Sequence, residues 1–259
     1  MRRVDVPPNL LTDVEAGDEL ELPSQQVHYL RDVLRLQEGD EVELFDGDGR
    51  VAHCRIIDME ATLGCELLRV GASERGESPL FTVLFQAIPK GKRWKWILEK
   101  ATELGVNAII PLQTERTVVQ IPKRRLEGRL ERWEKILASA TRQCQRTVVP
   151  QICAPMTIEE ARRREERDID LVAHPGGDEA PTPGRLLQDL DSPPGTVGIW
   201  IGPEGGFTDG EVCSMTEAGM KTVSLGRRIL RADTAGIAAL TLVQAAMGDL
   251  GARYCHDLP

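Results

Sequence analysis

The chain has 259 residues, of which 41% are hydrophobic, and a formal net charge of −9. This length allows one large or two ordinary domains with a substantial core, and the acidic balance excludes a uniformly basic nucleic-acid-binding protein. No apolar run approaches the ~18 residues that span a bilayer, and the N-terminus lacks the apolar segment of a secretory signal. The six cysteines form no CxxC pair and no Cys/His cluster at zinc spacing. We therefore expect a cytoplasmic protein with reduced thiols, no metal and no membrane segment.

The N-terminal part, residues 1–70, alternates short apolar runs with turn signals. The runs 42–45 and 51–57 flank an Asp-Gly-Asp-Gly turn, which is a hairpin signature, and 65–70 adds a further strand. Short strands of this kind predict a small β-barrel. The polar, glycine-bearing stretch 71–79 is typical of a linker, so we expect two domains, at 1–72 and 80–252.

From residue 80 onward, strand and helix patterns alternate. Strands are predicted at 81–87, 108–112, 169–173, 197–201 and 222–225, and helices at 92–104, 126–145 and 234–250. This alternation predicts an α/β domain with a parallel sheet and helices on both faces. Periodicity alone would suggest a Rossmann-like domain. However, no G-x-G-x-x-G motif opens a helix after the first strand, which argues against a nucleotide-binding Rossmann enzyme.

Two of the predicted strands end in glycine-rich loops. The strand 197–201 continues into GPEGG at 202–206, and the strand 222–225 continues into Gly226 and a basic segment. Glycine removes the side chain where a ligand or another backbone must come close. The two loops together indicate one ligand pocket, although each loop alone is also consistent with an ordinary tight turn.

Positive charge gathers in three segments, 90–100, 123–132 and 227–231, in spite of the negative total. Each segment is consistent with a surface that faces folded RNA, or with a solvated helix face. Trp94 and Trp96, within the first segment, either stack on bases or divide between a core and a boundary position.

Taken together, these motifs resemble the RsmE family of SPOUT-class methyltransferases, which methylate N3 of a uridine in 16S ribosomal RNA. GPEGGFTDGEV at 202–212, followed by LGRRILRADTA at 225–235, is similar to the family's cofactor-binding knot. HYLRDVLRL at 28–36, KGKRWKWILEKATELG at 90–105 and QCQR at 143–146 are similar to other family segments. The resemblance implies an N-terminal PUA-like β-barrel and a C-terminal SPOUT α/β domain with a trefoil knot at about residues 170–240.

The resemblance also implies S-adenosyl-L-methionine as cofactor, 16S ribosomal RNA or the 30S subunit as partner, and a homodimer. The cofactor is expected to contact mainly the backbone groups of the knot loops. The residues expected there are His174, Ile201, Gly202, Pro203, Glu204, Gly205, Leu225, Gly226, Ile229 and Leu230. RNA contacts are expected from basic residues of the matching segments: Arg31, Arg35, Lys90, Lys92, Arg93, Arg142 and Arg146.

The expected catalytic residues are Arg231 and Asp233. A cation at Arg231 would stabilise a uridine anion, and Asp233 is the one carboxylate of the second loop and a candidate base. A salt bridge from Arg231 to Glu204 or Asp233 is the alternative for this arginine. For His174, the alternative is a capping or surface histidine.

The chain departs from the family pattern at two places. Where the family usually has ILRTETA, this chain has ILRADTA, so Ala232 lacks a hydroxyl and Asp233 has a shorter reach than glutamate. Arg142 stands where the family usually has an acid. These changes weaken the case for a carboxylate base and leave the pocket motifs intact. They also keep open an alternative, an RNA-binding ribosome-assembly protein of the same fold with weakened catalysis.

Overall fold

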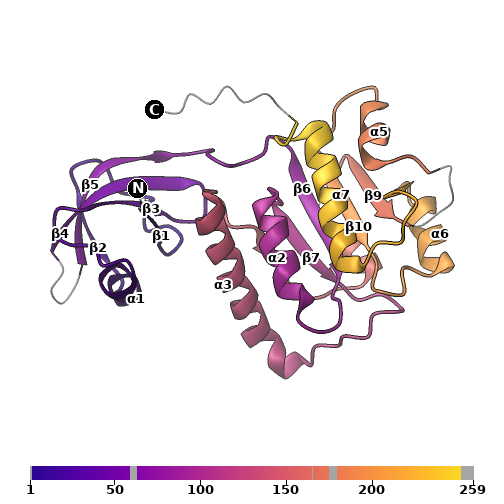
Figure 1. Ribbon diagram of the computed structural model, residues 1–259, viewed down its shortest axis with the longest axis horizontal. Helices are drawn as coiled ribbons and strands as arrows, with labels where there is room; N and C mark the ends of the chain where they lie inside the picture. The colour runs from indigo at the N-terminus through magenta and orange to yellow at the C-terminus, as the bar shows by residue number, and fades with distance from the viewer. Residues whose placement is uncertain (1, 59–62, 165, 175–179, 252–259) are drawn as a thin grey trace. The chain divides into compact units, whose positions relative to one another are not determined.

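The computed structural model describes residues 2–58, 63–164, 166–174 and 180–251 (Figure 1). It divides into two compact units, one made of Met1–Glu77 with Ala138–Val149 and the other of Ser78–Leu137 with Pro150–Pro259. The first unit therefore includes a second segment, 138–149, beyond the predicted boundary at residue 72. None of the helices in the described ranges has both the length and the apolar character that crossing a bilayer would require.

The first unit is built on a curled five-stranded sheet, a half-barrel with the order β1-β3-β4-β5-β2. The strands are β1 Arg2–Asp5, β2 Glu19–Leu22, β3 Glu41–Phe45, β4 Arg50–Asp58 and β5 Leu63–Ala72. A short helix, α1 Ser24–His28, continues as the π-helical turn η1 Tyr29–Val33. β3 and β4 pair antiparallel, as the hairpin signature predicts, and Asp46 accepts hydrogen bonds from the Asp48 and Arg50 amides in the turn. Alternate apolar side chains of these strands form the core of the unit.

The second unit contains a six-stranded sheet with the order β11-β9-β10-β6-β7-β8, in which every pair is parallel. The strands are β6 Phe81–Ala87, β7 Ala108–Leu112, β8 Gln151–Ile152, β9 Ile169–Ala173, β10 Thr196–Ile201 and β11 Lys221–Val223. The central strands read as near-continuous apolar runs because helices cover both faces of the sheet.

The helices of this unit are α2 Arg93–Glu103, η2 Lys123–Arg125, α4 Ile158–Arg162, α5 Pro183–Gln188, α6 Asp209–Glu217 and α7 Ala232–Met247, while α3 Leu126–Cys144 runs from this unit into the first. Figure 1 shows α7 crossing β6 and β10 on one face, next to α2. On the other face, Ile158 of α4 and Met215 of α6 pack against Phe85 and Trp200. The predicted parallel sheet with helices on both faces is therefore confirmed.

Most predicted elements lie within three residues of the observed ones. For example, α2 ends as expected just before Gly105, whose φ of +82° is the left-handed conformation that glycine adopts after a helix. Two differences matter for the site. β11 ends at Val223 rather than at 225, and α7 begins at Ala232 rather than at 234. The intervening residues 224–231 are consequently a loop at the edge of the sheet.

Candidate active site

His174, directly after β9, and the loops that follow β10 and β11 lie at one edge of the sheet, because the carboxyl ends of parallel strands lie together. They enclose a cavity of about 430 Å³, within the range of small-molecule sites. Open α/β sheets bind ligands at this edge. All ten residues that the resemblance assigns to the cofactor line the cavity, and Arg231 lines it as well. Asp233 is not among the lining residues.

The first loop, 202–206, is a tight turn packed on itself. A Cβ built on the buried Gly202 would lie 2.9 Å from the backbone nitrogen of Phe207 and 3.0 Å from the carbonyl carbon of Gly206. The Gly206 amide donates to the carbonyl of Pro203 at 2.8 Å. A side chain at Gly202 would therefore push the turn apart, which explains the glycine in structural terms.

The carboxylate of Glu204 ties this turn to the loop between β6 and α2. Glu204 Oε1 accepts a hydrogen bond of 2.8 Å from the backbone amide of Lys90. Lys90 and Lys92 are exposed, and Arg93 begins α2. Three of the residues predicted to bind RNA thus lie in a segment that is bonded to the cavity loop.

The second loop, 224–231, is open by comparison. Gly226 has φ +102°, and a Cβ there would meet nothing within 4 Å. Ile229 is 91% exposed, although it lines the cavity, and Arg227 and Arg228 are exposed beside it. Ile229 is the most exposed of the large apolar side chains that the structure describes, and it stands at the cavity, so this loop is a candidate contact surface for a ligand or partner.

His174 contributes a buried polar atom to the cavity. Its backbone amide donates to the carbonyl of Val223 at 3.2 Å, which fixes the start of the loop after β9. Its side-chain Nδ1 is buried without a hydrogen-bond partner among the described residues. An unpaired buried nitrogen is costly, so a bound ligand or water would satisfy it. The geometry favours a site residue over a surface histidine.

Arg231 and Asp233 differ in their surroundings. The Asp233 side chain is 16% exposed, and its Oδ2 lies 3.5 Å from Nε of Arg93. Glu204 is bonded to the Lys90 amide. No ion pair of Arg231 is found among the residues that the structure describes, and its side chain is exposed at the cavity. The alternative of a salt bridge to Glu204 or Asp233 therefore has no support here.

The remaining residues predicted to bind RNA lie in the first unit, and one of those predictions is wrong. Arg146 is only 2% exposed, and its guanidinium forms an ion pair of 2.7 Å with Glu77. Glu77 also accepts hydrogen bonds from the Thr147 and Val148 amides. Arg146 therefore holds the segment 138–149 inside the unit and does not face RNA.

Arg142 is also engaged inside the first unit. Its guanidinium forms an ion pair with Asp5, and burial lowers the pKa of this arginine. Its departure from the family pattern thus has a structural explanation. Arg31 and Arg35 are exposed, as a role in RNA binding requires.

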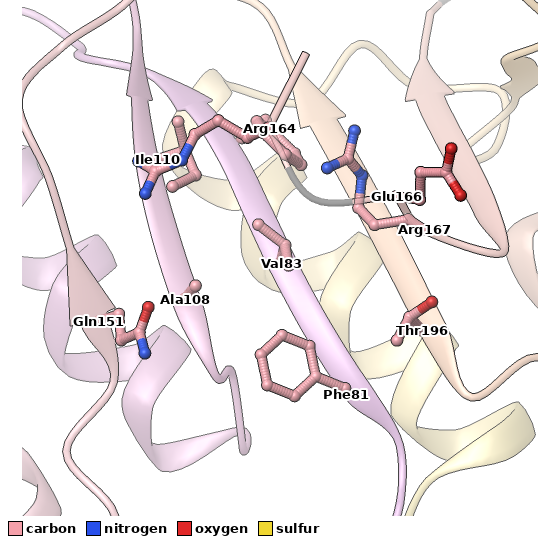
Figure 2. A pocket seen from close by; sticks show the side chains of 10 residues that line it. Phe81, Val83, Ala108, Ile110, Gln151, Arg164, Glu166, Arg167 and Thr196 are labelled. Carbon is pink, nitrogen blue, oxygen red and sulfur yellow. The ribbon is translucent and has the colours of Figure 1, made fainter. Parts of the chain in front are cut away.

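A second hollow, on the sheet face opposite α7, is too small for a cofactor. Figure 2 shows Phe81 and Val83 of β6 at its floor, with Arg164 and Arg167 above them. Its volume is about 50 Å³, enough for a few water molecules. Arg167 is bonded to Asp170 at 2.7 Å, so it stabilises the fold here.

The tryptophan pair of α2 divides between core and boundary. Trp94 is buried and packs against Trp133 with ring centroids 5.5 Å apart, while Trp96 is 41% exposed. The boundary interpretation is therefore confirmed for this pair.

Comparison with known proteins decides the family. A model described as an RNA methyltransferase domain matches residues 76–244, and one described as an RNA methyltransferase PUA domain matches residues 22–63. The chain is 37% identical over 228 residues to ribosomal RNA small subunit methyltransferase E of Synechocystis, covering 86% of this chain and 72% of the relative. The chain belongs to the ribosomal RNA small subunit methyltransferase E family.

Other members of the family agree. The methyltransferase E of Bacillus subtilis is 30% identical, over 89% of this chain and 91% of its own length. The methyltransferase E of Neisseria gonorrhoeae, solved bound to S-adenosyl methionine, superposes with a TM-score of 0.83 at 34% identity, covering 96% and 99% of the two chains. A Legionella pneumophila methyltransferase with bound SAM also gives 0.83 at 34% identity, covering 96% and 98%. The predicted family and its PUA and α/β domains are thus confirmed.

Sequence reasoning missed some residues of the site. Ala173, Gly206, Ser224, Arg228, Ala232 and Ala235 also line the cavity. Arg116, which follows the carboxyl end of β7, donates a hydrogen bond to the carbonyl of Gly205 in the first loop but does not line the cavity. Its position after a parallel strand was the available signal, because such loops gather at the same edge.

Proposed function

We propose that this protein methylates N3 of a uridine in small-subunit ribosomal RNA, with S-adenosyl-L-methionine as methyl donor. The observation that carries the proposal is the 430 Å³ cavity, where the ten expected cofactor residues converge. The cavity fits such a group in size and in the buried Nδ1 of His174, which has no hydrogen-bond partner among the described residues.

S-adenosylmethionine supplies an electrophilic methyl group on a sulfonium. The residues of the two loops bind and orient it through backbone groups, which fixes the direction in which the methyl group is presented. Fixed positioning of this kind supplies a large part of the rate in a two-substrate reaction. His174 Nδ1 provides a polar contact on the cavity wall.

Arg231 acts on the uridine. The N3 position carries a proton, and N3 becomes a good nucleophile when that proton passes to solvent water; the N3–methyl bond would then form as the carbon–sulfur bond of the sulfonium breaks. A guanidinium beside the cavity favours the anionic base over the neutral one, which lowers the barrier to attack. Arg231 suits this role because it is exposed at the cavity without a described ion pair.

Asp233 has a different role in this proposal. Its carboxylate is engaged with Arg93 at 3.5 Å, and it stands in the first turn of α7, where a negative charge is favourable. We assign it to holding Arg93 against the start of α7. Arg93 then presents its remaining donors, together with Lys90 and Lys92, to RNA phosphates.

The proposal includes the larger organisation of the enzyme. Residues 1–72 serve as the PUA-like RNA-binding domain, with Arg31 and Arg35 as contacts. Residues 80–252 form the catalytic domain, with a trefoil knot at about 170–240. The enzyme acts as a homodimer in the cytoplasm, on 16S ribosomal RNA or the 30S subunit.

The test combines cofactor binding with product analysis. Titration calorimetry should show binding of S-adenosylmethionine, and nuclease digestion of treated, undermodified 30S subunits should yield N3-methyluridine by mass spectrometry. A methylated product at another uridine atom would contradict the N3 assignment. Absence of cofactor binding, with RNA affinity retained, would favour the ribosome-assembly protein.

A further inference from the structure

The loop after β7 holds the glycine turn 202–206 from outside the cavity. Arg116 donates from Nη1 to the carbonyl oxygens of Gly205 at 2.7 Å and of Phe207 at 3.4 Å. Its aliphatic stem also packs on the turn, since a Cβ built on Gly205 would lie 3.3 Å from Arg116 Cδ. One side chain thus fixes the backbone on both sides of Gly206.

The backbone that carries Arg116 is itself anchored. The Glu115 amide donates to Glu211 Oε1 at 2.8 Å, and the Thr208 hydroxyl lies 3.4 Å from Glu115 Oε2. Glu211 and Thr208 form the capping box at the start of α6. The guanidinium is therefore held by a segment attached to the helix that follows the glycine turn.

We propose that Arg116 is a positioning residue that fixes the conformation of the cofactor turn. It is not among the residues that line the cavity, so it acts through Gly205 and Phe207 rather than by contact with the cofactor. Arginine suits this task because its guanidinium offers several donors in a fixed plane, which lysine does not. The link to the cofactor rests on the proposed function, whereas the bonds to the turn do not.

The first test needs no cofactor. Hydrogen exchange of the peptide 203–208, which includes the Gly206 amide bonded to Pro203, should be faster in Arg116→Ala than in the wild type. Arg185→Ala removes another cation of this unit, 79% exposed on α5, and should leave this exchange unchanged. Unchanged exchange in Arg116→Ala would overturn the proposal, even for a protein that binds no S-adenosylmethionine.

The second test measures cofactor affinity. Arg116→Ala should weaken binding of S-adenosylmethionine on the order of tenfold, the scale of one lost charged hydrogen bond. Arg116→Lys should lie between the alanine variant and the wild type. An unchanged affinity in folded Arg116→Ala overturns the proposal. So does a loss confined to RNA affinity, because Arg116 would then be an RNA contact.

A double-mutant cycle separates the contact from a general loss of stability. In the wild-type background, Gly205→Ala places a methyl group against the Arg116 stem and should weaken cofactor binding. In the Arg116→Ala background the same substitution meets more space and should cost less. Strict additivity of the two effects would show that the residues are not coupled and would contradict the proposed positioning role.

Discussion

The two loops that line the cavity differ in how firmly they are packed. The loop 202–206 is buried at Gly202, bonded within itself, and tied to neighbouring segments by Glu204 and Arg116. The loop 224–231 is exposed along most of its length, with Ile229 at 91%. The packed loop therefore has one fixed conformation, while the exposed loop leaves its side chains free to contact a partner; under the proposed function the first would shape the cofactor site and the second would face the substrate.

The largest effect should come from breaking the packed loop. Gly202→Val forces a β-branched side chain against the backbone of Gly206 and Phe207, so the turn must move. We expect loss of S-adenosylmethionine binding by calorimetry, with the circular dichroism spectrum retained. Gly128→Val, at an exposed position of α3 with open space, is the control. Normal binding by a folded Gly202→Val variant would place the site elsewhere.

The next effect tests the exposed loop. Arg231→Ala should lower the single-turnover methylation rate about 100-fold, the scale of one oriented electrostatic group. Cofactor affinity should change little, because the proposed cofactor contacts come from backbone groups of the loops and not from the Arg231 side chain. Arg231→Lys keeps the charge without the planar fork and should be intermediate. An equal loss of rate and cofactor affinity would make Arg231 a part of the cofactor pocket instead.

A smaller effect is expected at Gly226, where glycine is required by its positive φ, than at Gly202, where a side chain would clash with the backbone. Gly226→Ala meets no atom within 4 Å but must adopt φ +102°, which costs a non-glycine residue about 1–2 kcal/mol. Because the loop is open, we expect cofactor affinity to fall less than tenfold. Asparagine tolerates positive φ better than alanine, so the cofactor affinity of Gly226→Asn should fall still less. A loss as complete as that of Gly202→Val would remove the difference between the loops.

The smallest effect concerns the other end of the sheet. Asp168 accepts hydrogen bonds from the Thr196 amide at 2.8 Å and the Gly195 amide at 2.7 Å, and the bonds from Thr196 and Gly195 hold its pKa below the usual value of an aspartate. Because the pKa is lower in the folded state, the ionised carboxylate stabilises the protein at pH values above the unfolded-state pKa. This stabilisation is lost as the pH falls through the folded-state pKa. Asp168→Asn should therefore reduce Tm at neutral pH, and the difference should shrink between about pH 5 and pH 3. Cofactor affinity at neutral pH should not change, and a loss of it would show that the two ends of the sheet are coupled.

Much of this organisation could be predicted from the sequence, because it depends on local patterns. Apolar runs followed by glycine placed β10 and its turn correctly, and parallel strands bring such turns to one edge. The burial of Arg146 could not be predicted, since its partner Glu77 lies 69 residues away. The position of Arg116 after a parallel strand indicates the correct edge of the sheet, but its hydrogen bond to Gly205, 89 residues further along the chain, could not be predicted.

A hydrogen-exchange map of the protein with and without S-adenosylmethionine would locate the cofactor site directly. We expect strong protection of peptides 202–206 and 224–231, with the larger change in the second loop because it is exposed without the cofactor. Peptides around Phe81 and Arg164, at the small hollow, should not change. Protection there, with none at the two loops, would show that the cofactor does not bind in the cavity lined by these loops.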